Sequence, residues 1–568
     1  MILGAFWMLV ANAAAGLGAF ALLQRVATSN PSVDLVLFLL IRLLLISGTL
    51  LIAGLAGIMS SLGVGLLATA VLAILLGRGE HLRLPPLRWP DLGRASTWIV
   101  IAMAMKLLAQ VWLFSPHLGD ALAYHLPKIA EWIRVAGFSR EMGVHPHVTF
   151  PAGFELVETW WVVFLHHDVL IEMGGLEFLA LASSATYALA RYLGLSQSGS
   201  GFAALAYALV PGLNLSATSC LNDVPVAGLV LSTAALVLWR ASFWMVLLSA
   251  GLGMGTKATY LYTLPGWFFL SLLVWREAKL KSPSVGWCVS LAFLSVMVGL
   301  FWYARNAIWY ENPFYPVGSF GYDQEAVAVQ VGPKLSSLWR NFSDLIETRI
   351  TDSRGAYGAF VDNIAGWGPL VFACGPLSLF LGLFEDRGVR RLSLSFGVAL
   401  VSCFLLMIHD LWSLRYVFFF PALLCIATAR LAEKHQGVRR IAFAAMGFSF
   451  VGTLLPYDIP LKDLKALAAQ PWRTRTTLLI REPELGEGPV ACFGGYSANS
   501  YLLYGPSFSR RVVFLRSTSP DDLVEDMRRA GAEILYAAPM GGRQEEILRR
   551  CIRGGRLKSV RGKVFKLE

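Results

Sequence analysis

Long apolar runs, separated by short polar connections, fill most of the chain between residues 2 and 455. An apolar run of about 20 residues can cross a membrane as a helix, and tilt or burial among neighbouring helices blurs its ends. The pattern therefore predicts an all-α polytopic membrane bundle of about 14 transmembrane helices. The predicted spans are 2–23, 35–58, 62–76, 97–114, 169–193, 202–215, 224–238, 243–255, 261–275, 285–302, 368–383, 392–408, 416–431 and 441–455.

The pattern changes after residue 456, where polar residues become frequent and the apolar runs shorten. Short strand-like runs alternate there with amphipathic segments, which predicts a small α/β domain at the C-terminus. The predicted strands are 490–493, 511–515, 533–537 and 558–566, and the predicted helices are 521–530 and 544–552.

The chain of 568 residues is thus expected to have three parts. Residues 1–96 form accessory N-terminal transmembrane helices. Residues 97–456 form a transmembrane core with large outer loops at 115–168 and 306–367. Residues 457–568 form the soluble C-terminal α/β domain.

Composition agrees with a membrane protein and argues against a nucleic-acid partner. Hydrophobic residues make up 56% of the chain and charged residues only 15%, whereas soluble domains carry roughly 25% charged residues. The formal net charge is +11, but Lys and Arg occur in short clusters between apolar runs. That distribution is typical of cytoplasmic loops of membrane proteins and not of a basic nucleic-acid-binding face.

The basic clusters also predict how the chain is oriented. They follow the third, ninth, eleventh and thirteenth spans, so all four lie on one face, which should be cytoplasmic. Both termini, the two large loops and the C-terminal domain then lie outside the cytoplasm, in a multi-pass protein of the inner or plasma membrane. The first apolar run lacks a basic leader and a clear cleavage site, so we expect a retained span. The clusters are Arg78, Arg83, Arg88 and Arg94; Arg276, Lys279 and Lys281; Arg387, Arg390 and Arg391; and Lys434, Arg439 and Arg440.

Seven cysteines are present, and their spacing does not indicate a metal site. Five lie in or beside apolar runs and are expected to be small buried residues. Cys492 and Cys551 lie in the C-terminal domain, where an oxidising compartment would allow them to pair. The sequence leaves that pairing open.

Asp120 is the first candidate for chemistry. It begins Asp120-Ala-Leu-Ala-Tyr124-His125-Leu-Pro-Lys128, shortly after the fourth predicted span. Apolar residues at helical spacing follow, which predicts an interfacial helix beside the mouth of the bundle. The competing interpretation is a solvated Asp that caps this helix.

Asp223 is the second candidate, and the predicted topology puts it on the same face as Asp120. It stands just before the seventh predicted span, with Pro225 in the first turn. A helix N-cap is therefore a strong alternative, although a capped carboxylate is also an oriented one.

Three cations are predicted at span ends on that outer face: Lys257, Arg305 and Arg415. Ionisable residues at such positions often line a polar cavity, and the alternative is a side chain that reaches out to the membrane surface. Arg42 and Lys106 lie deeper in their spans and belong to the same class. The pairs His145 with His147, and His166 with His167, could bind a metal, but each lacks distant partners.

In this order the motifs resemble those of GT-C fold glycosyltransferases, such as protein O-mannosyltransferases and aminoarabinose transferases. Two acids match: Asp120 in the first outer loop and Asp223 before a span two helices later. The Gly-rich stretch that ends at Lys257 and the segment Leu414-Arg415-Tyr416 also match. The last match is Trp302-Tyr-Ala-Arg305-Asn306 followed by Glu311-Asn-Pro-Phe-Tyr-Pro316. The resemblance covers about residues 97–431. The first acid is a lone Asp where some members have an Asp-Glu pair, and the Trp-Trp-Asp motif of the oligosaccharyltransferases is absent.

The resemblance implies an inverting transfer of a sugar from a polyprenyl-phosphate donor to a lipid, glycan or protein acceptor on the extracytoplasmic face. It implies that Asp120 is the general base and that Asp223 orients the acceptor or shares that task. Lys257, Arg305 and Arg415 would bind the phosphate, and Tyr124, His125 and Lys128 would line the same pocket. No cofactor is required by this scheme, and a divalent metal stays an alternative.

Two other functions are compatible with the same residues. A transporter or flippase of lipid-linked sugars would use charged cavity residues without a catalytic acid, and it should show inverted repeats, which the sequence lacks. A non-enzymatic membrane scaffold would not need Asp120 and Asp223 in one cavity. We expect one structural observation to separate these functions: whether Asp120, Asp223 and Arg415 face one outward-open cavity of substrate size.

Overall fold

The structure is a computed structural model, and it describes residues 2–28, 30–77, 93–116, 118–140, 142–143, 145–276, 284–316, 336, 364–406, 414–453, 485–494, 500–505, 507–538 and 541–568. Most of the predicted loop 306–367, the start of the tail at 457–484 and the basic connections at 78–92 and 277–283 lie outside these residues.

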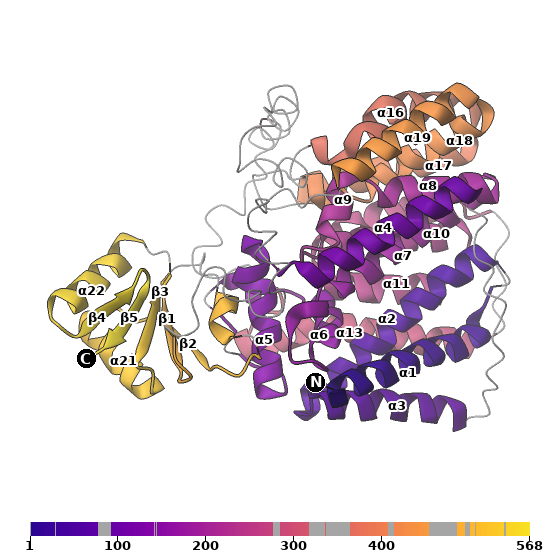
Figure 1. Cartoon of the computed structure of the whole chain (residues 1–568). Helices are drawn as coiled ribbons and strands as arrows, with labels where there is room; N and C mark the ends of the chain where they lie inside the picture. Colours follow the sequence, from indigo (N-terminus) through magenta and orange to yellow (C-terminus); the bar gives the residue numbers. More distant parts are fainter. Residues whose placement is uncertain are drawn as a thin grey trace.

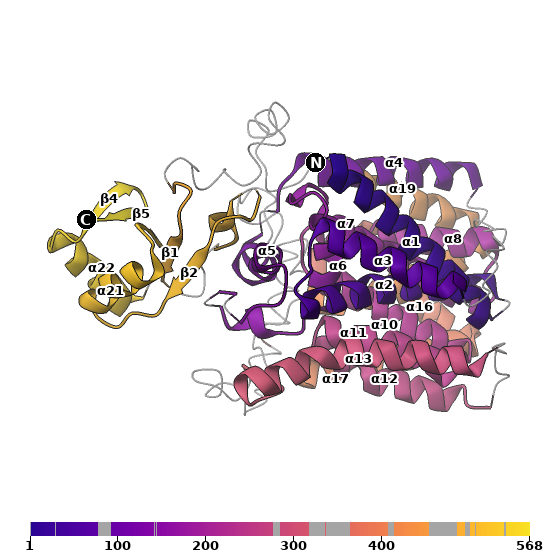
Figure 2. The same ribbon diagram turned by 90° about the horizontal axis from the view of Figure 1, so that it is seen from below.

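A helical bundle accounts for most of the described chain, and the C-terminal domain projects from one end of it (Figures 1 and 2). The bundle consists of α1 (Ile2–Val26), α2 (Pro31–Ala56), α3 (Ser61–Gly77), α4 (Gly93–Leu113), α6 (Gly153–Val162), α7 (Met173–Tyr192), α8 (Gln197–Ala208), α9 (Pro211–Ser216), α10 (Asp223–Leu238), α11 (Phe243–Thr256), α12 (Thr259–Leu273), α13 (Val285–Tyr310), α16 (Gly368–Glu385), α17 (Arg387–Leu406), α18 (Phe420–Lys434) and α19 (Gln436–Gly452). The chain also forms the π-helix η1 (Ala121–His125), α5 (Leu126–Val135) and the short helices η2 (Pro146–Thr149), η3 (Asp168–Leu170), η4 (Ile364–Trp367) and η5 (Leu414–Val417).

The predicted spans fall on helices, but the count of 14 is not confirmed. Seven helices within the described ranges are long and apolar enough to cross a membrane, and α3, α10 and α11 are shorter apolar helices. The sixth predicted span is broken between α8 and α9, because Pro211 begins α9 and forces an extended backbone at Val210 (ψ 118°). The predicted spans 392–408 and 441–455 run slightly beyond the described residues.

Close packing between helices depends on glycines near the end of α11. A Cβ atom on Gly299 of α13 would lie 2.2 Å from the carbonyl oxygen of Gly251, and one on Gly255 would lie 2.8 Å from the Gly299 Cα. Small residues four apart allow two apolar helices to approach closely. The Gly-rich stretch before Lys257 is therefore a helix-packing surface.

The same stretch also receives α6. A Cβ atom on Gly153, the first residue of α6, would lie 2.8 Å from the carbonyl oxygen of Gly255. Two residues beyond these glycines are Glu155 on α6 and Lys257 after α11, so the contact brings both charged side chains to one place.

The C-terminal domain has five strands in the order β2-β1-β3-β5-β4. Its elements are β1 (Val490–Phe493), η7 (Ser500–Tyr504), β2 (Val512–Leu515), α21 (Pro520–Ala530), β3 (Ile534–Ala537), α22 (Gly542–Arg553), β4 (Leu557–Arg561) and β5 (Val564–Leu567). Strand β1 pairs in parallel with β2 and β3, whereas β5 is antiparallel to β3 and β4. Helices α21 and α22 pack on one face of the sheet.

Two predictions for this domain can be compared with the structure: the strand at 558–566 and the state of the two cysteines. The single strand predicted at 558–566 is wrong, because the chain turns at Gly562 (φ 52°) and forms the hairpin of β4 and β5. A two-residue turn with a positive φ suits the twist of such a hairpin. Cys492 and Cys551 are both free thiols, and they pack in apolar clusters on opposite faces of the sheet.

The glycine contact predicts a sharp difference between two alanine substitutions on α13. Gly299→Ala would push α13 away from α11 and should lower the free energy of unfolding by about 1–3 kcal/mol, as over-packing does. Gly286→Ala, where no atom lies within 4 Å of the added Cβ, is the matched control and should match the wild type. Thermal unfolding of the detergent-purified protein measures both, and equal melting temperatures for the two variants would contradict the packing role.

Candidate active site

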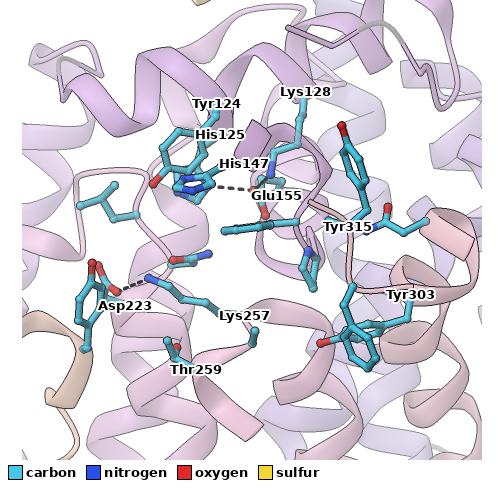
Figure 3. A pocket seen from close by; sticks show the side chains of 18 of the residues that line it. Tyr124, His125, Lys128, His147, Glu155, Asp223, Lys257, Thr259, Tyr303 and Tyr315 are labelled. Atoms are coloured by element: carbon cyan, nitrogen blue, oxygen red, sulfur yellow. Dashed lines mark hydrogen bonds and ion pairs between the residues drawn. The ribbon is translucent and has the colours of Figure 1, made fainter. Parts of the chain in front are cut away.

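A cavity of about 300 Å³ lies where the η1–α5 segment meets the ends of α6, α10 and α11 and the η5 turn (Figure 3). Its charged and ionisable lining residues are His125, Lys128, Glu155, Asp223, Lys257 and Arg415. Its rings include Tyr124, His147, Phe150, Tyr303, Tyr315 and Tyr416. Polar groups that converge in a ring-lined cavity are typical of a small-molecule site.

Asp223 holds two cations on one side of the cavity. Its Oδ1 accepts a hydrogen bond from Lys257 Nζ at 2.6 Å, and its Oδ2 lies 3.7 Å from Arg415 Nε. The carboxylate is 2% exposed, whereas the Lys257 and Arg415 side chains are 21% and 18% exposed. Two cations compensate the cost of burying this carboxylate, and their exposed parts remain open to an anion.

Arg415 also connects Asp223 to Asp120. Its Nη2 donates to Asp120 Oδ2 at 3.1 Å, and the Asp120 side chain is 43% exposed. One guanidinium therefore contacts two carboxylates that are far apart in the sequence. A planar group with several fixed donors is suited to this bridging geometry.

The ring of Tyr416 supports both cations. Lys257 Nζ lies 4.9 Å and Arg415 Cζ 5.3 Å from the centre of this ring. Cation–π attraction at such distances fixes a charged side chain without neutralising it. Tyr416 thereby holds Lys257 and Arg415 side by side.

Glu155 forms a second ion cluster on the opposite wall (Figure 3). It accepts a hydrogen bond from Lys128 and lies 2.9 Å from His125 Nδ1, and all three side chains are at most 3% exposed. Burial alone would raise the pKa of Glu155, but the charge of Lys128 and the contact with His125 outweigh it and lower this pKa to about 2. Burial lowers the pKa of His125, so its ring is neutral at pH 7.

Glu158 lies one helical turn beyond Glu155 and has the opposite character. Its side chain is fully buried, and burial, together with the charge of Glu155, raises its pKa well above the usual value. Folding therefore favours the neutral form of Glu158 and the ionised form of Glu155.

Arg305 does not line the cavity, but it stabilises segments that form the cavity wall. Its guanidinium donates to the Thr149 carbonyl and, at 2.7 Å, to Asn306 Oδ1. Asn306 Nδ2 donates in turn to the carbonyl oxygens of Thr149 and Tyr315 at 3.0 and 3.2 Å. The Arg-Asn pair thus ties η2 to the loop that presents Tyr315 to the cavity.

The structure brings together most of the residues singled out in the sequence. Asp120 and Asp223 share Arg415, while Tyr124, His125, Lys128 and Lys257 line the cavity. Arg42 and Lys106 lie elsewhere, with Arg42 paired to Glu177 and Lys106 donating to Asn214.

The capping alternatives are wrong. Neither Asp120, which precedes η1, nor Asn222, which precedes α10, makes a side-chain capping bond, and Asp223 is the first residue of α10. Both aspartates bond to cations instead.

Sequence reasoning missed Glu155 and the supporting role of Asn306. Glu155 sits in an apolar run in the first outer loop, where a charged residue without a visible partner was itself a signal. For metal binding, no group of three or more His, Cys, Asp or Glu side chains that could hold an ion occurs in the described part of the chain.

Comparison with known proteins identifies the fold. No protein family matches the sequence, and no curated protein matches it significantly. Among solved structures, the chain is similar to the glycosyltransferase ArnT from Cupriavidus metallidurans in the apo state, with a TM-score of 0.52 and 12% identity over 83% of this chain and 98% of that one. The archaeal oligosaccharyltransferase AglB from Archaeoglobus fulgidus, in complex with an inhibitory peptide and a dolichol-phosphate, gives a TM-score of 0.41 and 11% identity over 78% and 69%.

ArnT and AglB are both GT-C fold glycosyltransferases. The likeness to ArnT extends over nearly all of that protein, so this chain has the GT-C fold. With its apolar helices, it is a multi-pass membrane protein.

Replacement by glutamine should cost much more stability at Glu155 than at Glu158. Glu155→Gln removes the only carboxylate described in contact with Lys128 and should lower the free energy of unfolding at pH 7 by about 3–5 kcal/mol. Because folding depresses the pKa of Glu155, its contribution is complete above pH 4.5 and is lost as the pH falls towards 2. The gap between wild type and Glu155→Gln should therefore narrow below pH 4.5.

Glu158→Gln is the matched control on the same helix, since the environment of Glu158 favours the neutral acid, which a neutral amide resembles. It should cost far less stability at pH 7. Thermal unfolding of both variants across this pH range provides the measurement, and equal losses at pH 7 would show that the two glutamates do not differ in charge.

Proposed function

We propose that this protein is a membrane glycosyltransferase that transfers a sugar from a polyprenyl-phosphate donor to a hydroxyl acceptor on the extracytoplasmic face, with inversion. The acceptor oxygen attacks the anomeric carbon and the bond from that carbon to the phosphate oxygen breaks. The phosphate oxygen keeps the electron pair, and a carboxylate takes the hydroxyl proton. The products are a glycoside and polyprenyl phosphate.

The observation that carries the proposal is the bridge formed by Arg415. It joins two carboxylates from separate parts of the chain, and Lys257 completes the cluster at the edge of a cavity. Glycosyl transfer to a hydroxyl needs a base and positive charge for the leaving phosphate within reach of one carbon atom. A scaffold protein has no use for this convergence.

Asp120 suits the role of base better than Asp223. Its carboxylate is 43% exposed and has one oxygen on Arg415, so an acceptor hydroxyl can reach it. Asp223 is buried under two cations and suits the role of orienting them. A general base in this position contributes about 10²–10⁴-fold to the rate.

Lys257 and Arg415 are the phosphate ligands of the proposal, because each is partly exposed and aimed at the cavity. Lys128 and His125 are bound to Glu155, and they shape the wall where the sugar would lie. Arg305 acts from behind the wall through Asn306 and Thr149, as a positioning residue.

A lipid-linked donor also fits an apolar groove between α16 and α17. The groove has a volume of about 710 Å³ and is lined by residues such as Leu383, Leu394, Val401 and Leu405. Helix α17 ends at Leu406, and the described chain resumes at η5, which carries Arg415. A polyprenyl chain in this groove would have membrane lipids as its neighbours.

The activity is tested by incubating the purified protein with a panel of polyprenyl-phosphate sugars and measuring released polyprenyl phosphate. A glycosyltransferase releases it in step with the glycoside formed. A flippase, the strongest alternative, moves the donor across vesicle membranes and releases none.

Asp120→Asn should reduce transfer by about 10²–10⁴-fold, because the amide cannot accept the hydroxyl proton. Asn still offers an oxygen to Arg415, so donor binding and the melting temperature should stay close to those of the wild type. Initial rates of polyprenyl phosphate release measure the effect. A folded Asp120→Asn protein that transfers sugar at the wild-type rate would remove Asp120 from the mechanism.

Arg415→Lys should reduce kcat by about 10²-fold, since a lysine keeps the charge but cannot bridge both aspartates and so misplaces them. Arg430→Lys is the control, because Arg430 also binds a carboxylate and a carbonyl (Asp386 and Leu193) but does not line the cavity. Steady-state kinetics on both variants give the comparison. If both lose the same activity, the bridge has no special role.

A further inference from the structure

The C-terminal domain shares an apolar core with the segment that carries Asp120. From the loop side this core contains Ala121, Leu122 and Leu126 of the η1–α5 segment. From the domain side it contains Tyr501, Leu503 and Tyr504 of η7. All six side chains are at most 2% exposed. We call this buried contact between η7 and the η1–α5 segment the seam.

The η1–α5 segment therefore lies between the cavity and the C-terminal domain. Tyr124, His125 and Lys128 point from it into the cavity, and Asp120 precedes it and reaches Arg415. Its other side packs on η7, which Figure 1 shows as the part of the domain nearest to α5. A π-helix is rare and needs support from its surroundings, and here η7 is part of that support.

Tyr501 ties η7 to a further element of the bundle, η3, which begins at Asp168. Its hydroxyl donates to Asp168 Oδ2 at 3.0 Å, and both side chains are 2% exposed. Burial first, and then the charge of Asp168, raises the pKa of Tyr501 well above its usual value, so the hydroxyl keeps its proton and remains a donor. A buried hydrogen bond to a carboxylate fixes both partners in direction as well as in distance.

The seam also extends behind Asp223. Cys220 belongs to the same apolar cluster and has a left-handed backbone (φ 55°), three residues before Asp223. A strained residue of this kind persists only where its surroundings hold it in place. The apolar cluster that contains η7 thus also includes a residue close in sequence to Asp223.

Domains that are merely tethered meet through interfaces that are small and polar. The seam has the opposite character, because its centre consists of fully buried apolar and aromatic side chains. We propose that the C-terminal domain is a structural part of the active site. Tyr501 is a positioning residue: its bond to Asp168 fixes η7 on η3, and η7 in turn holds the η1–α5 segment and Asp120 in register with Arg415. This inference rests on the proposed function for its kinetic consequence but not for its structural one.

Tyr501→Phe tests the proposal with little loss of packing. Hydrogen exchange in peptides covering residues 118–135 should become faster, whereas peptides from α21 and α22 should be unchanged. The rate constant kcat should fall by about 10-fold or more, as misplaced catalytic groups cause. The KM for the donor should change little, since Lys257 and Arg415 are untouched.

Tyr536→Phe is the matched control, because it removes a hydroxyl from a buried tyrosine on β3 of the same domain. It should leave exchange at 118–135 and kcat unchanged. Asp168→Asn changes the acceptor of the same hydrogen bond. The double variant with Tyr501→Phe should change exchange and kcat no more than the more severe single variant does.

The outcomes separate the two proposals. Unchanged exchange at 118–135 in Tyr501→Phe, or equal changes in Tyr536→Phe, would overturn the positioning role. Faster exchange at 118–135 in a protein that transfers no sugar would support the positioning role and contradict the proposed function.

Discussion

Charge that is buried at the mouth of an apolar bundle has to be paired, and the pairing of Asp223 with Lys257 and Arg415 is the constraint on which the site depends. Each partner comes from a different part of the fold: the start of α10, the end of α11 and the η5 turn. Satisfying one carboxylate therefore fixes three chain segments together. Arg415 then extends the cluster to Asp120, so the partly exposed acid is placed by the buried one.

Close packing of the helix backbones positions the charged residues of this site. Gly251, Gly255 and Gly299 let α11 and α13 touch, and Gly153 lets α6 rest on the same helix end. The two ion clusters of the cavity, one around Asp223 and one around Glu155, are both positioned from that contact. These glycines thus set the distances between charged side chains that none of them touches.

The sequence predicted the helical bundle, the α/β tail and the meeting of Asp120, Asp223, Lys257 and Arg415, because apolar periodicity and ordered motifs are local signals. Its count of about 14 membrane crossings stays unconfirmed, since length and burial among neighbours are properties of the packed bundle. It also missed Glu155, whose partners Lys128 and His125 become visible only when α5 and α6 meet. The role of Arg305 behind the wall depends on the folded position of Thr149, which no local pattern encodes.

The charges in and beside the cavity are paired before any substrate arrives. Asp223 and Glu155 line the cavity together with Lys128, Lys257 and Arg415, and Asp120, which is not among the lining residues, pairs with Arg415. A phosphate entering such a site has to compete with Asp223 and Asp120 for cations that are already engaged. In the proposed reaction, binding of the donor would be an exchange of ion partners with modest net affinity. The same exchange would run in reverse when the lipid phosphate leaves and the aspartates regain their cations.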